Sequence, residues 1–271
     1  MRRVFVAVVA TLAGGCGGQY IVTAPDTVAL PGQTAAVVVR LQRSELWKYA
    51  PASREASITA RLGGLVRAAR TDKRGYAAVG VPAPARPGQY QVALSHQDIW
   101  GDTASGAATL YVLDPNVPVA AVDLDSLPDG KKARAAAAAI ERIAARVQVV
   151  YVTRRYAGRP ERADKILLRW GYPDSAVVPL GRLRAWYDMR WWKHRGDPAL
   201  AALRRRLPGL KWGISAEDDE AEVFLRAALT VLAVGKFKVE GPRPEGAQVH
   251  RFKSWALLKL PAPGESDQPG D

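Results

Sequence analysis

Short apolar runs separated by clusters of Gly, Pro and Asp dominate residues 19–115. Runs of this length that are rich in β-branched residues and end in turn residues predict strands rather than helices. The expected strands are 35–41, 56–62, 76–81, 89–95 and 107–113. Several short strands at this spacing indicate an all-β, immunoglobulin-like sandwich over 19–115. The aromatic residues of this part, Trp100 among them, are expected to be core or packing residues rather than platforms for a ligand.

The hydrophobic pattern changes after Asp114, where strand-like runs begin to alternate with helical stretches. The expected strands are 119–122, 147–152, 176–180, 210–214 and 230–234, and the expected helices are 131–146, 159–170, 199–207 and 218–229. Such alternation is typical of a mainly parallel sheet. The predicted fold class is therefore two domains, the all-β sandwich followed by an α/β domain over 117–260. The segment 261–271, rich in Pro, Gly and acids, is expected to be a disordered tail.

Two carboxylates one residue apart, Asp123 and Asp125, end the first apolar run of the α/β part. If this run is a buried strand, both carboxylates lie at its carboxyl end, where ligands bind in open α/β sheets. Thr153 follows the second expected strand, and the polar segment 215–219 follows the fourth. Because the carboxyl ends of parallel strands meet at one edge, we expect these residues to converge. A carboxylate in such a place can hold Mg²⁺ or attack phosphorus, while its neighbour transfers protons.

The N-terminus has the pattern of an export signal, with Arg2 and Arg3, an apolar stretch over 4–12, and small residues up to Cys16. Residues 12–16 resemble the processing site of bacterial lipoproteins, in which the cysteine becomes the acylated first residue. Cys16 is the only cysteine of the chain, so no internal disulfide can form. We expect a signal peptide over 1–15 and a lipid anchor on Cys16. The protein would then be exported and held at the cell membrane or outer membrane, facing the periplasm or the cell surface; an ordinary signal peptide is the alternative.

The order of these motifs resembles the haloacid dehalogenase superfamily, and most closely the catalytic domain of lipin and actin-patch phosphatidate phosphatases. The resemblance is carried by Asp123-Leu124-Asp125, by Thr153 after the second strand, by Lys193 with the residue that follows it, and by the segments 167–173 and 207–213. It implies a haloacid dehalogenase-like (Rossmannoid) domain. It also implies a phosphomonoester hydrolase that uses Mg²⁺ and an aspartyl-phosphate intermediate, with a phospholipid such as phosphatidate as one expected substrate.

The resemblance implies a role for each matching residue. Asp123 would be the nucleophile, and Asp125 would be the acid that protonates the leaving oxygen and then activates water. Lys193 would offset charge between nucleophile and phosphate. Thr153 would hydrogen-bond the phosphoryl oxygens, and from the residues themselves Arg154 is a second phosphate-binding candidate. The implied metal ligands are Asp123, Asp125 and Asp219.

One position departs from the resemblance in a way that bears on catalysis. Ile214 stands where a metal-ligating aspartate is implied, and an isoleucine cannot coordinate Mg²⁺. Asp219 matches the second acid of that motif, and the other acids of the segment 217–219 could compensate. Two functions therefore stay open, an active phosphatase and a catalytically degenerate surface lipoprotein that serves as a binding or structural module.

The charge of the chain bears on its partners. Lys and Arg outnumber Asp and Glu by 39 to 26, a formal net charge of +13, and much of the excess lies in 154–211. Most of these side chains are expected to form solvated helix faces. Nucleic acid is not an expected partner of an exported, membrane-anchored protein. The expected partner is a phosphorylated small molecule or an anionic lipid.

Overall fold

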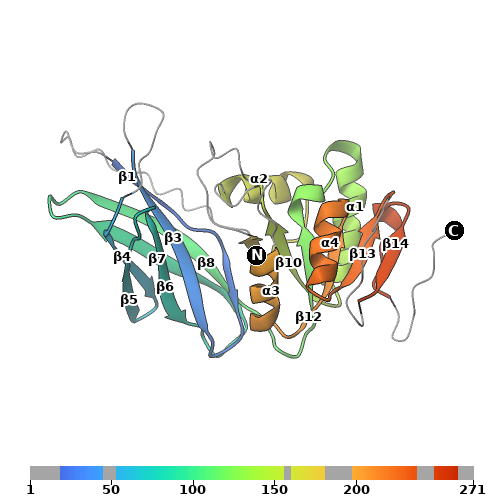
Figure 1. Cartoon of the computed structure of the whole chain (residues 1–271), viewed down its shortest axis with the longest axis horizontal. Helices are drawn as coiled ribbons and strands as arrows, with labels where there is room; N and C mark the ends of the chain where they lie inside the picture. Colours follow the sequence, from blue (N-terminus) through green and yellow to red (C-terminus); the bar gives the residue numbers. More distant parts are fainter. Residues whose placement is uncertain (1–18, 45–52, 156–159, 181–196, 237–246, 262–271) are drawn as a thin grey trace. The chain divides into compact units, whose positions relative to one another are not determined.

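The computed structural model describes residues 19–44, 53–155, 160–180, 197–236 and 247–261 (Figure 1). The expected signal peptide, Cys16, Lys193 and most of the expected tail lie outside these residues. The described chain divides into two compact units, one formed mainly by residues before Tyr111 and the other mainly by residues from Tyr111 onward. Within the described residues, no helix is both long enough and apolar enough to cross a membrane.

The first unit is built on antiparallel strand pairing. Its strands are β1 (Gln19–Thr23), β3 (Thr34–Ser44), β4 (Ser57–Leu62), β5 (Leu65–Arg70), β6 (Tyr76–Pro82), β7 (Gly88–Gln97) and β8 (Thr103–Val112), and the short β2 (Thr27–Ala29) pairs with β8. They form a three-stranded sheet in the order β1-β3-β6 and a five-stranded sheet in the order β2-β8-β7-β4-β5. Alternate residues of β3, such as Val37 and Val39, are fully buried, as expected for strands with one face on a core.

The second unit contains a six-stranded sheet in the order β11-β10-β9-β12-β13-β14, in which every adjacent pair is parallel. Its strands are β9 (Val119–Asp123), β10 (Gln148–Thr153), β11 (Val177–Pro179), β12 (Leu210–Ser215), β13 (Thr230–Val234) and β14 (Val249–Phe252). Its helices are α1 (Gly130–Ala144), α2 (Pro160–Trp170), α3 (Asp197–Arg206) and α4 (Asp218–Arg226), with single 3₁₀ turns η1 (Leu124–Ser126) and η3 (Trp255–Leu257).

Both faces of this sheet are covered, so its central strands are buried on both sides. All five residues of β9 are buried. Ala120 and Val122 pack on one face with Ile140 of α1, whereas Val119 and Ala121 belong to the core on the other face. That second core is completed by α3 and α4, for example through Leu200 and Phe224. The apolar run before Asp123 is therefore continuous because both faces of the strand need apolar side chains.

The predicted fold class is wrong for this chain. The described residues form mostly β-sheet, and no haloacid dehalogenase-like Rossmannoid domain is shown. The prediction failed because strand–helix alternation and short motifs at strand ends are shared by many unrelated parallel sheets. Alternation correctly predicts a parallel pairing, but it does not specify a superfamily.

Gly213 lets α4 approach β12 closely. A Cβ atom at Gly213 would overlap the side chain of Phe224, which is fully buried. We expect Gly213→Ala to lower the free energy of unfolding by about 1–3 kcal/mol, because the helix must shift to make room. Urea unfolding of the full chain measures this. Gly209→Ala is the matched control, since the nearest atom to its Cβ would be at 3.8 Å, and an equal loss in both variants would contradict the packing argument.

Candidate functional site

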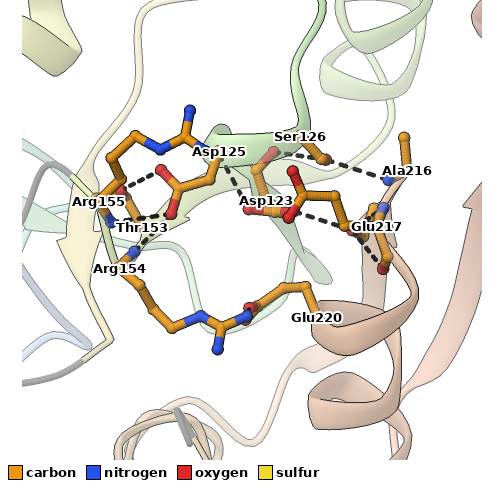
Figure 2. A network of polar contacts seen from close by, with 10 residues as sticks. Asp123, Asp125, Ser126, Thr153, Arg154, Arg155, Ala216, Glu217 and Glu220 are labelled. Carbon is orange, nitrogen blue, oxygen red and sulfur yellow. Dashed lines mark hydrogen bonds and ion pairs between the residues drawn. The ribbon is translucent and has the colours of Figure 1, made fainter. Parts of the chain in front are cut away.

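Polar side chains converge where β9, β10 and β12 end and α4 begins (Figure 2). Strand β9 lies between β10 and β12 in the sheet, so the chain order reverses on either side of it. In open parallel sheets, the crevice outside the carboxyl ends of the strands at such a reversal is where ligands bind. The elements that end there supply Asp123 and Asp125 from β9 and η1, Thr153 and Arg154 from the end of β10, Ser215 from β12, and Glu220 from α4.

Asp123 lies at the centre of the site and is only 2% exposed. One carboxylate oxygen, Oδ1, accepts a hydrogen bond from the backbone N–H of Asp125 at 3.0 Å. The other, Oδ2, accepts one from the hydroxyl of Ser215 at 2.9 Å. Burial, together with the nearby charges of Glu220 and Asp125, raises the pKa of Asp123 to about 7. The buried carboxylate is thus oriented by two hydrogen-bond donors.

The carboxylate of Asp125 occupies a cradle of three donors at the end of β10. Its Oδ1 accepts from the Thr153 hydroxyl at 2.6 Å, and its Oδ2 accepts from the backbone N–H groups of Arg154 and Arg155 at 2.8 and 2.9 Å. A hydroxyl and two consecutive backbone N–H groups are also the donors that proteins use to bind phosphate oxygens. The cradle therefore fits an anionic group, and in this structure that group is the chain's own carboxylate.

Glu220 brings a third carboxylate to the site from the first turn of α4, and it is 2% exposed. Its Oε2 forms an ion pair with the guanidinium of Arg154. Its Oε1 is buried and has no hydrogen-bond partner among the described residues. Burial raises the pKa of Glu220 to about 7; Arg154 opposes the shift, whereas the charge of Asp125 adds to it. A buried carboxylate oxygen without a partner is costly unless a ligand satisfies it.

A second set of hydrogen bonds fixes the loop after β9 against the loop after β12. The hydroxyl of Ser126 donates to the backbone carbonyl of Asp123 at 3.1 Å and accepts from the N–H of Ala216 at 3.1 Å. The Ser215 hydroxyl also accepts from the N–H of Glu217 at 3.0 Å. These bonds hold the two carboxyl-end loops at a set separation, so the position of Asp123 depends on both strands.

The structure brings together four of the residues that the sequence singled out: Asp123, Asp125, Thr153 and Arg154 (Figure 2). Asp219, by contrast, is exposed on the first turn of α4, and the next residue is the buried acid of the site. Lys193 and Cys16 are outside the described residues.

Sequence reasoning placed the segment 215–219 at this edge but assigned no role to Ser215, which donates to Asp123, and it missed Glu220 as the buried acid. Helical spacing could have identified the acid, because Glu220, Val223 and Phe224 lie at i, i+3 and i+4, and all three are buried.

The donor set fits a magnesium ion held by a small number of carboxylates. No three Asp, Glu, His or Cys side chains among the described residues come close enough to form a cage for a metal. Mg²⁺, however, is usually bound through one or two carboxylates, with waters and substrate phosphate oxygens completing its shell. Glu220 Oε1, which has no hydrogen-bond partner among the described residues, and the buried carboxylate of Asp123 are the candidate oxygens.

Comparisons with known proteins identify no family for this chain. No protein-family model matches it, and no curated protein does. Among solved structures, a bacterial immunoglobulin-like domain from the ice-binding adhesin of M. primoryensis is 17% identical; the match covers 36% of this chain and 98% of that one, with a TM-score of 0.25.

Two further solved structures show similarly weak likeness. The Ig1-2 module of a Drosophila receptor protein tyrosine phosphatase is 13% identical, and the match covers 39% of this chain and 60% of that one, with a TM-score of 0.27. A carbohydrate acetylesterase from Xanthomonas citri is 14% identical, covering 79% and 60%, with a TM-score of 0.32. None of these comparisons indicates a haloacid dehalogenase.

Proposed function

We propose that the protein is a Mg²⁺-dependent phosphomonoester hydrolase in which Asp123 is the nucleophile. The observation that carries this proposal is the convergence of three carboxylates, Asp123, Asp125 and Glu220, beside a three-donor anion cradle at one edge of a parallel sheet. Carboxyl groups that lie close together disfavour one another's ionisation, because their negative charges repel, unless a cation binds among them. An anion cradle next to a cation-favouring cluster suits a phosphate ester and its metal together.

In the first step, a carboxylate oxygen of Asp123 attacks phosphorus. The bond from phosphorus to the leaving oxygen breaks, and protonated Asp125 donates its proton to that oxygen. The product is an aspartyl-phosphate on Asp123 and a free alcohol. The hydrogen bonds from Ser215 and from the Asp125 N–H hold the attacking carboxylate in one orientation, which reduces the entropic cost of reaching the reacting geometry.

In the second step, Asp125 removes a proton from water, and the water oxygen attacks phosphorus. The bond from phosphorus to Asp123 breaks, which restores the carboxylate and releases inorganic phosphate. Asp125 acts in both steps, so its carboxylate must leave the cradle. Once it leaves, the Thr153 hydroxyl and the N–H groups of Arg154 and Arg155 become available to the phosphoryl oxygens, and the acid moves to the side of the leaving group.

A bound Mg²⁺ would offset the charge of the carboxylates and of the phosphoryl oxygens, and Asp123 and Glu220 are the residues that would hold it. Arg154 supplies a positive side chain that forms an ion pair with Glu220 of the cluster. When its guanidinium releases Glu220, it can bind a phosphoryl oxygen of the substrate instead. The chain's own residues thus provide the nucleophile, the acid, the cradle and one cation.

We further propose that the protein is exported and anchored through an acyl group on Cys16, and that its substrate is a phosphorylated small molecule or an anionic lipid such as phosphatidate. The supports are the export pattern of residues 1–16 and the net charge of +13, because a basic protein accumulates at anionic membrane surfaces.

Phosphate release from purified full-length protein tests the proposed activity. The substrates are p-nitrophenyl phosphate, a phosphosugar and phosphatidate in mixed micelles, each with Mg²⁺ and with EDTA. We expect release from at least one substrate with Mg²⁺ and none with EDTA. No release from any substrate, or equal release with EDTA, would overturn the proposal and leave the non-catalytic binding module as the function of this site.

Glu220→Gln should weaken Mg²⁺ binding by about tenfold or more, because it removes one of two carboxylates that hold the ion. The amide oxygen can still accept from Arg154, so the fold should be retained. Isothermal titration with Mg²⁺ measures the affinity without reference to activity.

Asp219→Asn is the matched control for this experiment. It removes the same charge from the adjacent, exposed position, so Mg²⁺ affinity should be unchanged. If Asp219→Asn weakens binding and Glu220→Gln does not, the ligand assignment is wrong and the acid implied by the sequence motif is the ligand.

A further inference from the structure

Two large apolar side chains project from the turn between β7 and β8. Ile99 is 90% exposed and Trp100 is 83% exposed, although the sequence predicted that Trp100 is a core or packing residue. Isolated exposed apolar residues are common on proteins. Two consecutive ones at a hairpin tip, both almost fully in water, are the arrangement seen at surfaces that contact a membrane or a partner.

The turn that carries these side chains is built by hydrogen bonds. Asp98 Oδ1 accepts from the backbone N–H groups of Trp100 and Asp102, both at 2.9 Å. The N–H of Asp98 donates to the carbonyl of Asp102 at 3.0 Å, and Gly101 adopts the positive φ of +88° that the turn needs. The exposure of Ile99 and Trp100 is thus set by a shaped turn.

The same aspartate ties the tip to the beginning of the described chain. The hydroxyl of Tyr20, in β1, donates to Asp98 Oδ2 at 3.1 Å. Tyr20 follows Cys16 by four residues, a span of at most about 14 Å even when fully extended. Arg43 is the register partner of Tyr20 in β3 and is exposed. An acyl group on Cys16 would therefore keep this end of the first unit at the bilayer surface.

We propose that the Ile99–Trp100 tip inserts into the interface of the membrane to which Cys16 is anchored. This inference rests on the proposed lipid anchor. Trp is favoured at the boundary between headgroups and acyl chains because its ring is apolar and its N–H is polar. Ile99 adds apolar area that only a non-aqueous surface can cover, and Arg43 adds a positive charge that favours anionic headgroups. The tip would act as a second contact that orients the first unit on the bilayer.

The first unit contains its own control for this contact. The β4–β5 hairpin carries exposed Leu65 (42%) and Val66 (49%). Strand β4 pairs antiparallel with β7, with Ile58 opposite His96 and Arg61 opposite Ala93. The β4–β5 turn therefore lies at the end of these strands opposite to the β7–β8 turn, and it should not reach the bilayer.

An environment-sensitive fluorophore at each tip tests the proposal. Full-length Ile99→Cys and Leu65→Cys proteins are produced in a host that acylates lipoproteins, labelled with NBD, and placed in phosphatidylcholine–phosphatidylglycerol vesicles. Trp100→Cys serves as a second probe of the tip. Mass spectrometry verifies the acyl group on Cys16, and spin-labelled lipids serve as quenchers. We expect NBD at position 99 to shift to shorter wavelengths and to be quenched several-fold more strongly than NBD at position 65.

Each other outcome overturns the proposal for a different reason. If Cys16 is acylated but quenching is equally weak at positions 99 and 65, the tip does not insert, and the anchor proposal stands. If NBD at position 99 is shielded from water but not quenched by lipid, a protein surface covers the tip. If Cys16 carries no acyl group, the anchor proposal and this inference both fail.

Discussion

Asp123→Asn is expected to abolish phosphate release and at the same time make the protein harder to unfold. The loss of activity follows because an amide oxygen is a poor nucleophile toward phosphorus. No other carboxylate among the described residues is held in the position of Asp123 and could replace it as the nucleophile. Removal of a nucleophile typically lowers kcat by factors well above about 10³. We therefore expect release by Asp123→Asn to fall to the background rate on every substrate that the wild-type protein hydrolyses.

The gain in stability follows from the raised pKa of Asp123. In the folded protein the group keeps its proton up to a pH of about 7, whereas its ordinary pKa is 3.8. Between these values the folded state binds more protons than the unfolded state, so the free energy of unfolding falls as pH rises. Above about pH 7 this cost is complete. Asparagine does not ionise and therefore avoids it.

The amide also preserves the local hydrogen bonds. Its oxygen can still accept from the Asp125 N–H, and its NH₂ group can donate to the Ser215 hydroxyl, which reverses the direction of that second hydrogen bond only. We expect Asp123→Asn to raise the free energy of unfolding of the metal-free protein by about 1–3 kcal/mol at pH 8, and by much less near pH 4. The corresponding rise in melting temperature is several degrees.

Thermal unfolding in EDTA at the two pH values, together with the phosphate-release assay, measures both effects. Asp219→Asn is the control, because it removes an exposed carboxylate and should change neither activity nor the pH dependence of stability. Retained phosphate release in Asp123→Asn would disprove its role as nucleophile. A loss of stability at pH 8 would show that its charge is compensated in the folded protein and that the cluster is not a cation site.

The sequence predicted those elements that can be recognised from the hydrophobic pattern of their own residues. Strand β13 has the predicted bounds, and β9 and β10 match to within a residue, because each is a short run of mostly apolar residues. Strand β5 was missed, since its residues are mostly exposed and lack the alternation that identifies a half-buried strand. Strand β14 was missed as well, and it pairs with β13 as a long-range contact that no local pattern specifies.

The sequence predicted the part of the candidate site that is positioned by the ends of the strands. Asp123, Asp125, Thr153 and Arg154 meet because β9 and β10 are adjacent and parallel. The contribution of α4 was not predictable from motif order, because the rotation of the helix decides which of Asp218, Asp219 and Glu220 turns inward. That rotation is set by the packing of Val223 and Phe224 in the core. Tertiary packing therefore selected the acid, and the segment that the motif indicated, 215–219, ends one residue before it.

Ile214→Asp places an aspartate where the resemblance implies a metal ligand. We expect this substitution to unfold the second unit rather than to add a ligand to the site. Side chains alternate along a strand, so if Ser215 faces Asp123, Ile214 faces the opposite side of the sheet. Ile214 is fully buried and lies between Val122 of β9 and Leu232 of β13, its register partners. An aspartate there would be a buried charge without a partner.

The cost combines a lost apolar contact with the burial of an unpaired carboxylate, and together these exceed about 4 kcal/mol. Urea unfolding and circular dichroism of the full chain measure it. Ile214→Val is the control for volume alone and should cost about 0.5–1.5 kcal/mol. A folded Ile214→Asp protein that binds Mg²⁺ more tightly than wild type would contradict this placement, because position 214 would then face the metal. Ile214 is accordingly a core residue. Its mismatch with the motif is not by itself a reason to regard the site as inactive, because Glu220 brings a buried carboxylate to the site from the next element of the chain.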